Sequence, residues 1–436
     1  MHLASDSEYR AEITRALNHA LDHVPFYQRW KPDDPGTGHP VEMRYSALPR
    51  LTKKDIRAHM PKGFIPREKD FKAGVESGEV ELVNTSGTTE DRSSIVWYQP
   101  WWDDSEHAAA TLHTGLDRVI NGRQREAVLT TPLCAGTVCH VGDLPVEERT
   151  LGRLLFLNQQ ADPCRWLPRD MDRMIQELDH FRPELLEADP AYLAILCRYA
   201  LEQKKSLFRP RFISLTYEFP SRLHYRQMRR AFPDVPLLSS YGSTETGHLL
   251  TECEQGRFHQ NTRFCHLDFQ PLKPSSGDPQ VGRILVTTLG NPWVSLIRFD
   301  VGDLVRLETR TCPCGRTDGL TLSRILGRLR DITFTETGRV ITVDELDATV
   351  GETNTLVTYQ VEQTDPRDLI FHYVSAPGHH PPLPTIQAGL HSLYGAGMRI
   401  IMRAEVAIPT EQSGKFRLAR NTTTWNPEDL FTTRMA

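Results

Sequence analysis

A short hydroxyl-rich segment has the composition of a loop that holds an anion. It reads TSGTT and consists of Thr85, Ser86, Gly87, Thr88 and Thr89. Because glycine can adopt a positive φ, such a loop can bend tightly and direct O–H and backbone N–H groups at one point. An anion suits that point, although these residues alone do not identify it as a phosphate.

Four further segments carry groups that could act on a nucleotide or an acid. They read YGSTET at 241–246, IRFDVGDL at 297–304, GRLRD at 327–331 and SGKFR at 413–417. A carboxylate such as Asp303 can accept two hydrogen bonds at once, which suits a vicinal diol. The chain lacks the P-loop pattern, because Gly414 and Lys415 are followed by Phe416 and not by Ser or Thr.

Cysteines and a histidine in two distant segments have the spacing of metal ligands. Cys253 and His259 have five residues between them, and the segment CPCGR at 312–316 supplies Cys312 and Cys314. Three thiolates and one imidazole form a four-ligand set that suits a closed, structural Zn²⁺ site. Two alternatives stay open: these residues are reduced core cysteines, or Cys265 or His266 replaces one of the ligands.

Composition narrows the class of partner. The chain has 436 residues, 39% of them hydrophobic, and 51 Lys+Arg against 56 Asp+Glu give a net charge of −5. Such a balance provides no basic footprint for nucleic acid, so we expect a small-molecule partner. No stretch approaches the roughly 18 apolar residues of a spanning helix, and the first residues, MHLASDSEYR, lack a signal pattern. We therefore expect no membrane partner, a cytoplasmic protein and, for its eight scattered cysteines, no disulfide framework.

Periodicity predicts the elements that must position these residues. Apolar residues at helical spacing predict an amphipathic helix over 8–24, and Thr52 has the side chain of an N-cap for a short second helix. From about residue 80 to 300, strand-like runs such as SIVWY, AVLTT and RILVTT alternate with helical stretches at 170–180 and 190–203. This alternation is typical of an α/β fold with sizeable sheets.

The pattern changes near residue 327. The segment 327–350 predicts a turn, a strand, a glycine turn, a second strand and a helix. We therefore predict a large N-terminal domain over 1–326, with β-sheets flanked by helices, and a small, mobile C-terminal α+β domain over 327–436.

Taken together and in this order, the five segments resemble those of the adenylate-forming superfamily of acyl- and aryl-CoA synthetases. A closer resemblance is to the phenylacetate:coenzyme A ligase branch, whose members open with a helix followed by VPFY and later LP…TKxDLR. This chain has VPFYQRW at 24–30 and LPRLTKKDIR at 48–57, so the likeness covers nearly its whole length.

The resemblance implies an ATP-dependent, two-step ligase. In the first step a carboxylic acid, by family likeness an aromatic or small ring-bearing one, attacks the α-phosphorus of ATP and releases pyrophosphate. In the second step the thiol of coenzyme A displaces AMP. The implied cofactors are ATP, Mg²⁺, coenzyme A as co-substrate and, as in similar ligases of this branch, a structural Zn²⁺. An acyl carrier protein and a second copy of the chain, as a homodimer, are further partners that the sequence leaves open.

The resemblance also assigns roles to residues. Thr244 matches the residue that meets the α-phosphate, Glu245 the Mg²⁺ ligand, and Lys415 the mobile lysine that reaches the α-phosphate and the substrate carboxylate. Asp303 matches the carboxylate that binds the ribose hydroxyls, and Arg330 falls at the domain hinge. The remaining nucleotide contacts that it implies are Thr85, Ser86, Gly87, Thr88, Thr89, Tyr217, Glu218, Tyr241, Gly242, Ser243 and Arg328.

Two segments depart from the family pattern, and the acyl pocket carries a weaker assignment. After the TSGTT loop the family usually has Gly, then Pro and often Lys, whereas this chain has an acidic pair followed by Arg92. Tyr217 stands where the family has a small residue, and it either stacks on a ring or fills the core. An acyl pocket is implied by position alone, and packing is the alternative for its residues Cys134, Ala135, Gly136, His140 and Ser240.

Two alternative functions remain at this stage. One keeps the adenylation and transfers the acyl group to a carrier-protein thiol or to an amine. The other is a non-catalytic nucleotide-binding homologue, which the altered residues after the phosphate loop suggest and the presence of Glu245, Asp303 and Lys415 opposes.

Overall fold

The structure is a computed structural model that describes residues 6–84, 93–133, 142–351 and 355–432. The TSGTT segment and residues 134–141 lie outside these ranges. The predictions for Thr85, Ser86, Gly87, Thr88 and Thr89, and those for Cys134, Ala135, Gly136 and His140, therefore stay predictions.

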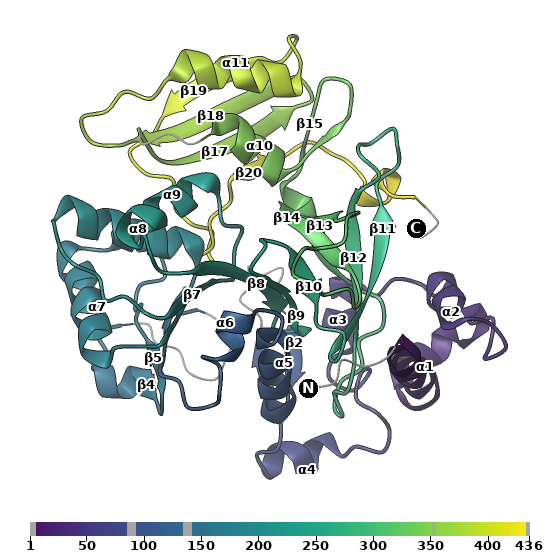
Figure 1. The fold of residues 1–436 in the computed structure, drawn as a ribbon. Coiled ribbons are helices and arrows are strands. Elements are labelled where there is room, and N and C mark those ends of the chain that lie inside the picture. Colours follow the sequence, from purple (N-terminus) through teal and green to yellow (C-terminus); the bar gives the residue numbers. More distant parts are fainter. Residues whose placement is uncertain (1–5, 85–92, 134–141, 352–354, 433–436) are drawn as a thin grey trace.

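One large sheet forms the centre of the fold (Figure 1). It has twelve strands in the order β11-β12-β13-β14-β10-β9-β8-β7-β6-β3-β5-β4. The strands from β5 to β8 are parallel, and β9 pairs antiparallel with β8, so the sheet is mixed. The bounds on the parallel side are β3 Glu126–Leu129, β4 Thr150–Leu151, β5 Leu154–Phe156, β6 Leu185–Ala188, β7 Phe212–Leu215 and β8 Leu237–Ser243. Those on the antiparallel side are β9 Gly247–Glu252, β10 Phe258–Gln260, β11 Cys265–Pro271, β12 Val281–Thr288, β13 Phe299–Leu307 and β14 Thr321–Arg328.

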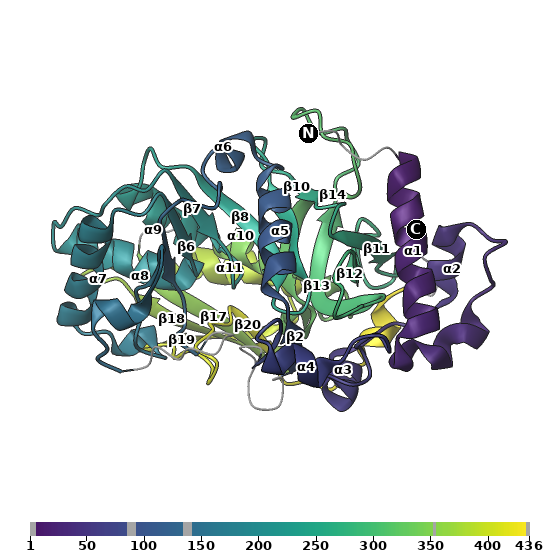
Figure 2. The same ribbon diagram turned by 90° about the horizontal axis from the view of Figure 1, so that it is seen from below.

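Helices cover the two faces of the parallel strands (Figure 2), as expected where strands are short apolar runs. One face packs against α7 and α8, with Leu129 and Leu186 among its buried residues. The other face packs against α5 and α6 through Leu116 and Leu185. The helical bounds are α5 Gln99–Ala110, α6 Thr114–Asp117, α7 Pro168–Phe181, α8 Pro190–Glu202 and α9 Arg222–Ala231, with short 3₁₀ turns at Val146–Arg149 and Pro163–Arg165.

The N-terminal segment packs at the antiparallel end of the sheet, opposite α7 (Figures 1 and 2). The predicted opening helix is confirmed as α1, and the Thr52 N-cap is confirmed by a capping box with Asp55. The strand-like run SIVWY is confirmed as β2, which pairs antiparallel with β1. The bounds are α1 Asp6–His23, a 3₁₀ helix Pro25–Asp33, α2 Val41–Ala47, α3 Lys53–His59, α4 Phe71–Glu76, β1 Glu81–Asn84 and β2 Ser94–Trp97.

The C-terminal part is a small α+β unit that lies over the large sheet in Figure 1. It has its own core around Phe371 and Leu390 and a four-stranded sheet in the order β19-β18-β17-β20. Its bounds are a 3₁₀ helix Leu329–Asp331, β15 Thr333–Phe334, β16 Val340–Ile341, α10 Val343–Val350, β17 Leu356–Asp365, β18 Asp368–Ser375, α11 Leu383–Tyr394, β19 Arg399–Ala404, β20 Ala419–Asn421 and a 3₁₀ helix Pro427–Leu430.

The two parts are joined at more than one place. The predicted boundary at 326/327 falls within β14, which runs to Arg328. Near the end of the described chain, Glu428 forms ion pairs with Arg50 and Arg283 of the large part. Phe431 also forms a β-bridge with Leu272. The division at 326/327 therefore stays a proposal, and the last residues pack on the large part.

No helix within the described residues combines the length and apolarity that crossing a membrane requires.

Replacing Gly242 by Ala should distort the end of β8. A Cβ at this position would overlap the backbone carbonyl oxygen of Gly247, which cannot move without separating β8 from β9. We expect Gly242→Ala to destabilise the fold by about 1–3 kcal/mol, seen as a lower midpoint of thermal unfolding. Gly38→Ala, where a Cβ has open space, is the matched control. Equal midpoints of thermal unfolding for the two variants would show that the close contact between Gly242 and Gly247 does not matter for stability.

Candidate active site and metal centre

A cavity of about 900 Å³ lies between the large sheet and the C-terminal unit. It is lined by residues from each of the segments 241–246, 297–304, 327–331 and 413–417. The predicted site residues that line it are Tyr217, Glu218, Ser240, Tyr241, Gly242, Ser243, Thr244, Glu245, Asp303, Arg328, Arg330 and Lys415. The fold therefore brings together groups that are far apart in the sequence.

The turn between β8 and β9 presents a carboxylate to this cavity. Tyr241, Gly242 and Ser243 belong to β8, and Thr244 and Glu245 form the turn after it. The turn is held by a hydrogen bond of 2.9 Å between the hydroxyls of Ser243 and Thr246. Glu245 is only 9% exposed, so bulk water competes little for its carboxylate and a ligand in the cavity can contact it.

Asp303 on β13 is held by Tyr241 of β8 and by Arg328 of the neighbouring strand β14. Its carboxylate accepts a hydrogen bond of 2.6 Å from the Tyr241 hydroxyl and pairs at 3.0 Å with Nε of Arg328. Asp303 and Arg328 are direct partners in the β13–β14 ladder, so strand register places them together. A carboxylate has about four lone-pair sites, so Asp303 can still accept further donors from a ligand.

Lys415 reaches the cavity because the loop that carries it packs against the large part of the chain. Gly414 has a φ of +83°, and a Cβ there would overlap the hydroxyls of Thr131 and Tyr192. The Tyr192 hydroxyl donates a hydrogen bond of 2.7 Å to the Gly414 carbonyl oxygen. Lys415 Nζ donates to the carbonyl oxygen of Tyr217 at 3.3 Å.

Buried carboxylates surround the Lys415 ammonium. The backbone N–H of Phe416 donates to Glu218 at 2.7 Å. Burial, followed by repulsion from Arg328, lowers the pKa of Lys415, while burial raises the pKa of Asp189 to about 7 and that of Glu218 well above its usual value. The positive charge of Lys415 is therefore stabilised by the carboxyl groups close to it. An anion bound beside Lys415 would stabilise that charge further.

Arg330 lies in the 3₁₀ helix at the start of the C-terminal unit and is tied to the Lys415 loop. It pairs with Glu411 at 3.2 Å, and Glu411 also pairs with Arg417 at 3.1 Å. Arg417 in turn pairs with Asp331 at 2.5 Å. The predicted hinge and the lysine loop thus share one network of ion pairs.

Sequence reasoning missed an acidic wall in the same cavity. Glu106 on α5, Glu126 on β3 and Glu187 on β6 all line it. Tyr217, which has a φ of +73°, donates a hydrogen bond from its hydroxyl to Glu187. A glutamate within the short apolar strand LLEA was the available signal, since carboxylates are rare in buried parallel strands.

The carboxyl groups of this wall resist ionisation. Burial, followed by the charges of Glu187 and Asp103, raises the pKa of Glu106 to about 7. Burial, followed by the charges of Glu187 and Glu106, raises the pKa of Glu126 well above its usual value, and burial raises that of Glu187. The wall therefore carries protons, or needs a cation, near neutral pH.

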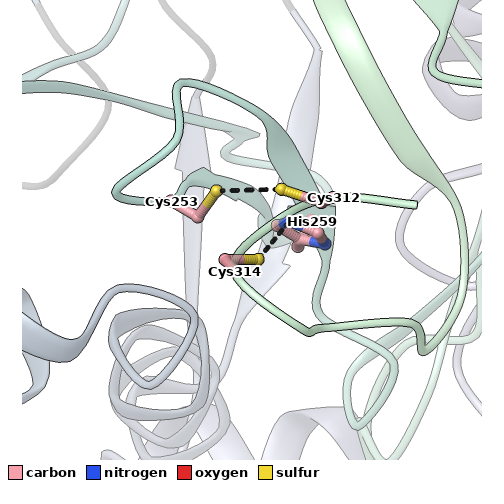
Figure 3. A group of neighbouring side chains, drawn as sticks. All are labelled: Cys253, His259, Cys312 and Cys314. Carbon is pink, nitrogen blue, oxygen red and sulfur yellow. Dashed lines mark hydrogen bonds between the residues drawn. The ribbon is translucent and has the colours of Figure 1, made fainter. Parts of the chain in front are cut away.

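The four predicted metal ligands form one cluster (Figure 3). One ligand atom from each of Cys253, His259, Cys312 and Cys314 lies within 4.8 Å of all the others. The sulfurs of Cys253 and Cys312 are 3.7 Å apart, and Cys314 Sγ is 3.2 Å from Nε2 of His259. Tetrahedral Zn²⁺ with Zn–S of about 2.3 Å and Zn–N of about 2.0 Å needs edges of about 3.8 and 3.5 Å. The donor set and its spacing fit such an ion.

Neighbouring groups support this cluster. Nδ1 of His259 lies 3.3 Å from the hydroxyl of Thr321, which suits a ring that binds metal through Nε2 and donates through Nδ1. Neither alternative ligand belongs to it: Cys265 Sγ contacts the carbonyl oxygens of Leu249 and Asn261. His266 lies beside Tyr9 and Asp268.

The acidic wall predicts a pH-dependent stability. The pKa of Glu106 is raised in the folded state, so its protonated form favours folding, and its contribution is lost as pH rises from about 4.5 through about 7. We expect Glu106→Gln to stabilise the chain by an amount on the order of 2 kcal/mol at about pH 8 and by little at about pH 5. Thermal unfolding at both pH values tests this, with the exposed Glu147→Gln as control. An equal effect at both values would contradict the raised pKa.

No protein-family model matches this chain. Among curated proteins, Protein CapK of Staphylococcus aureus is 23% identical over 338 residues, which are 75% of this chain and 68% of CapK.

Among solved structures, similarity extends along most of the chain. A 2-hydroxyisobutyryl-CoA ligase in the postadenylation state, in complex with 2-HIB-AMP, superposes with a TM-score of 0.67 at 17% identity, covering 92% of this chain and 86% of that one. The same ligase in the thioesterification state, with CoA, gives a TM-score of 0.54 at 18% identity, covering 95% and 89%. The amide bond synthetase McbA of Marinactinospora thermotolerans gives 0.51 at 16% identity, covering 82% and 70%.

These structures agree in fold with this chain and differ from it widely in sequence. They confirm the predicted α/β class and the resemblance to the superfamily in fold, whereas the phenylacetate:coenzyme A ligase branch stays a prediction. The chain has the fold of the adenylate-forming ligases.

Proposed function

We propose that this chain activates a carboxylic acid with ATP, forming an acyl-adenylate and releasing pyrophosphate, and then transfers the acyl group to the thiol of coenzyme A. The observation that carries the proposal is the convergence of Glu245, Asp303, Arg328 and Lys415 on one cavity. Fold alone does not assign an activity, so the proposal rests on these groups and on their chemistry.

In the proposed adenylation, Lys415 offsets negative charge. An acid carboxylate and the α-phosphate are both anionic, and their approach is unfavourable unless a cation lies between them. Lys415 would supply that cation, and its position on the Tyr217 carbonyl would direct it. Thr244 would donate a hydrogen bond to the α-phosphate from the neighbouring turn.

The nucleotide and its metal would be held by oxygen ligands and donors of the same cavity. Asp303 would accept hydrogen bonds from the ribose hydroxyls, while its ion pair with Arg328 would orient that carboxylate. Glu245 offers the hard carboxylate oxygen that Mg²⁺ prefers, together with substrate phosphates. Bound Mg²⁺ would neutralise phosphate charge.

The acceptor and the acid are the finer parts of the proposal. By the family resemblance the acid is aromatic or a small ring-bearing acid. Because the fold neighbours include a CoA ligase and an amide bond synthetase, transfer to an amine or to a carrier-protein thiol is the second candidate. Pyrophosphate release with the acid alone, followed by product analysis with coenzyme A, carrier protein or amine, separates them. Product with an amine alone would exclude the coenzyme A proposal.

A movement of the C-terminal unit would separate the two steps. The TM-score is higher to the postadenylation state of 2-hydroxyisobutyryl-CoA ligase than to its thioesterification state. This supports the view that the described arrangement suits adenylation, with residues 327–436 moving about Arg330 before thiol attack.

Removing Lys415 should stop adenylation without unfolding the chain. We expect Lys415→Ala to reduce acid-dependent pyrophosphate release by about 10²–10³-fold, since it removes a charge that acts on the transition state. Gly414→Ala should also reduce it, because a Cβ would push the loop away from Thr131 and Tyr192. The exposed Lys72→Ala is the control, and thermal unfolding checks each fold. Unchanged turnover in Lys415→Ala would remove the main catalytic assignment.

The Cys/His cluster would hold a structural Zn²⁺ between β9, β10 and the 312–314 segment. We expect about one zinc per chain by elemental analysis. Both Cys312→Ser and Cys314→Ser should lose the metal and unfold at a lower temperature, while Cys164→Ser, outside the cluster, should keep both properties. Metal-free chain with an unchanged unfolding midpoint would contradict a structural role.

A further inference from the structure

The acidic wall of the cavity is built into the sheet. Val128 on β3 pairs with Glu187 on β6, and Glu126 and Val128 pair with Leu154 and Phe156 on β5. Paired residues of neighbouring strands point to the same face, and residues two apart in one strand share that face. Two glutamates therefore emerge from an otherwise apolar floor, and all five side chains line the cavity.

Helix α5 closes this end of the cavity from the other side. It contributes Trp102 and Glu106 to the lining, and Trp102 packs edge-on against His248 at 4.8 Å between ring centres. Nε2 of His248 is buried without a hydrogen-bond partner in the part of the chain that the structure describes. Burial lowers the pKa of His248 to about 4, so the ring is neutral and does not repel a cation.

The carboxylates of this wall lack cationic partners. Among the described residues, the carboxyl groups of Glu106 and Glu126 form no hydrogen bond and no ion pair, although both lie deep in the protein and keep some exposure towards the cavity. Glu187 accepts only from the Tyr217 hydroxyl there. No described Lys or Arg affects the pKa of any of the three. Ionising these carboxyl groups costs free energy unless a bound cation compensates their negative charge.

A compact metal ion does not fit the wall as it stands. Within the described residues, only the Cys253 cluster brings three or more metal-ligating groups within 4.8 Å of one another. The three glutamates are more widely spaced and therefore suit a larger cation with several N–H donors, such as an ammonium group.

Tyr217 fixes the separation between the wall and the proposed reaction centre. Its carbonyl oxygen accepts from Lys415, and its hydroxyl donates to Glu187. A substrate whose carboxylate lies at Lys415 would thus reach the wall with its other end if it is about as long as a tyrosine residue. Tyr217 keeps a left-handed φ in this position, which is rare for a residue with a side chain.

We propose that the acid activated by this chain carries a protonated amine at the end remote from its carboxylate, and that Glu106, Glu126 and Glu187 bind this amine. The inference rests on the proposed function, since it takes Lys415 to mark the carboxylate end. His248 would accept one further hydrogen bond from the amine. A pocket built to receive such donors discriminates against an analogue that lacks them, because its polar groups are then left unpaired.

The test uses pairs of acids that differ in one group. The full chain is given ATP and either para-(aminomethyl)benzoate or para-ethylbenzoate, and likewise meta-(aminomethyl)benzoate or meta-ethylbenzoate, and aminohexanoate or heptanoate. Pyrophosphate release gives kcat/KM for each acid. We expect the amine member of at least one pair to exceed its alkyl partner by about tenfold or more.

Isosteric variants then assign the preference to the wall. Glu126→Gln and Glu187→Gln should bring that ratio close to one, while ATP binding by calorimetry stays unchanged and thermal stability does not fall. Glu147→Gln, on the surface, should keep the full preference. A merely structural role would instead lower stability and affect both acids of a pair equally.

The outcomes separate this inference from the proposed function. A preference for the alkyl member in every pair, or an unchanged preference in both glutamine variants, overturns the inference and leaves the ligase proposal intact. Where ATP binds but no acid releases pyrophosphate, calorimetric titration of each acid decides, and failure of every amine-bearing acid to bind also overturns the inference. Failure to bind ATP counts against the proposed function itself.

Discussion

The contact between the Gly414–Phe416 backbone and the large part of the chain determines the geometry of the candidate site. Gly414 fits against Thr131 and Tyr192 only because it lacks a side chain. That fit carries Lys415 to the carbonyl of Tyr217 and the N–H of Phe416 to Glu218. A buried lysine beside buried carboxylates is stable only in close pairing, so the docked loop and the charges around it depend on each other.

This constraint explains why one cavity can contain two regions of opposite character. One region holds Lys415 and Arg328, whose cations suit phosphate and carboxylate groups, beside the carboxylates of Glu245 and Asp303. Glu106, Glu126 and Glu187 make the other acidic, and Tyr217 connects the two through its backbone and its hydroxyl. A zwitterionic molecule, with a carboxylate at one end and an amine at the other, would complement both.

The sequence predicted features that local chemistry determines. The Thr52 cap and the helix over 8–24 depend on residue types at short spacing, and both appear in the structure. The four-ligand cluster combines two distant segments, but each segment shows a ligand pair at close spacing, and this cluster also appears in the structure. The convergence of Glu245, Asp303 and Lys415 was predicted only through resemblance, because no local rule relates segments so far apart. The acidic wall was missed for a related reason: Glu126 and Glu187 become neighbours only through the parallel register of β3 and β6. The end of β8 at Ser243 likewise depends on its pairing with β9, which local residue types do not reveal.

We propose that this cavity joins an acid to the AMP portion of ATP. The most direct test of this adenylation is the exchange of radiolabelled pyrophosphate into ATP by the purified chain, measured with and without a carboxylic acid and with no thiol present. We expect exchange that depends on the acid, because adenylation is reversible and takes place before any acceptor is needed. If a folded chain that binds ATP shows no exchange with any of the acids, the proposed adenylation is wrong.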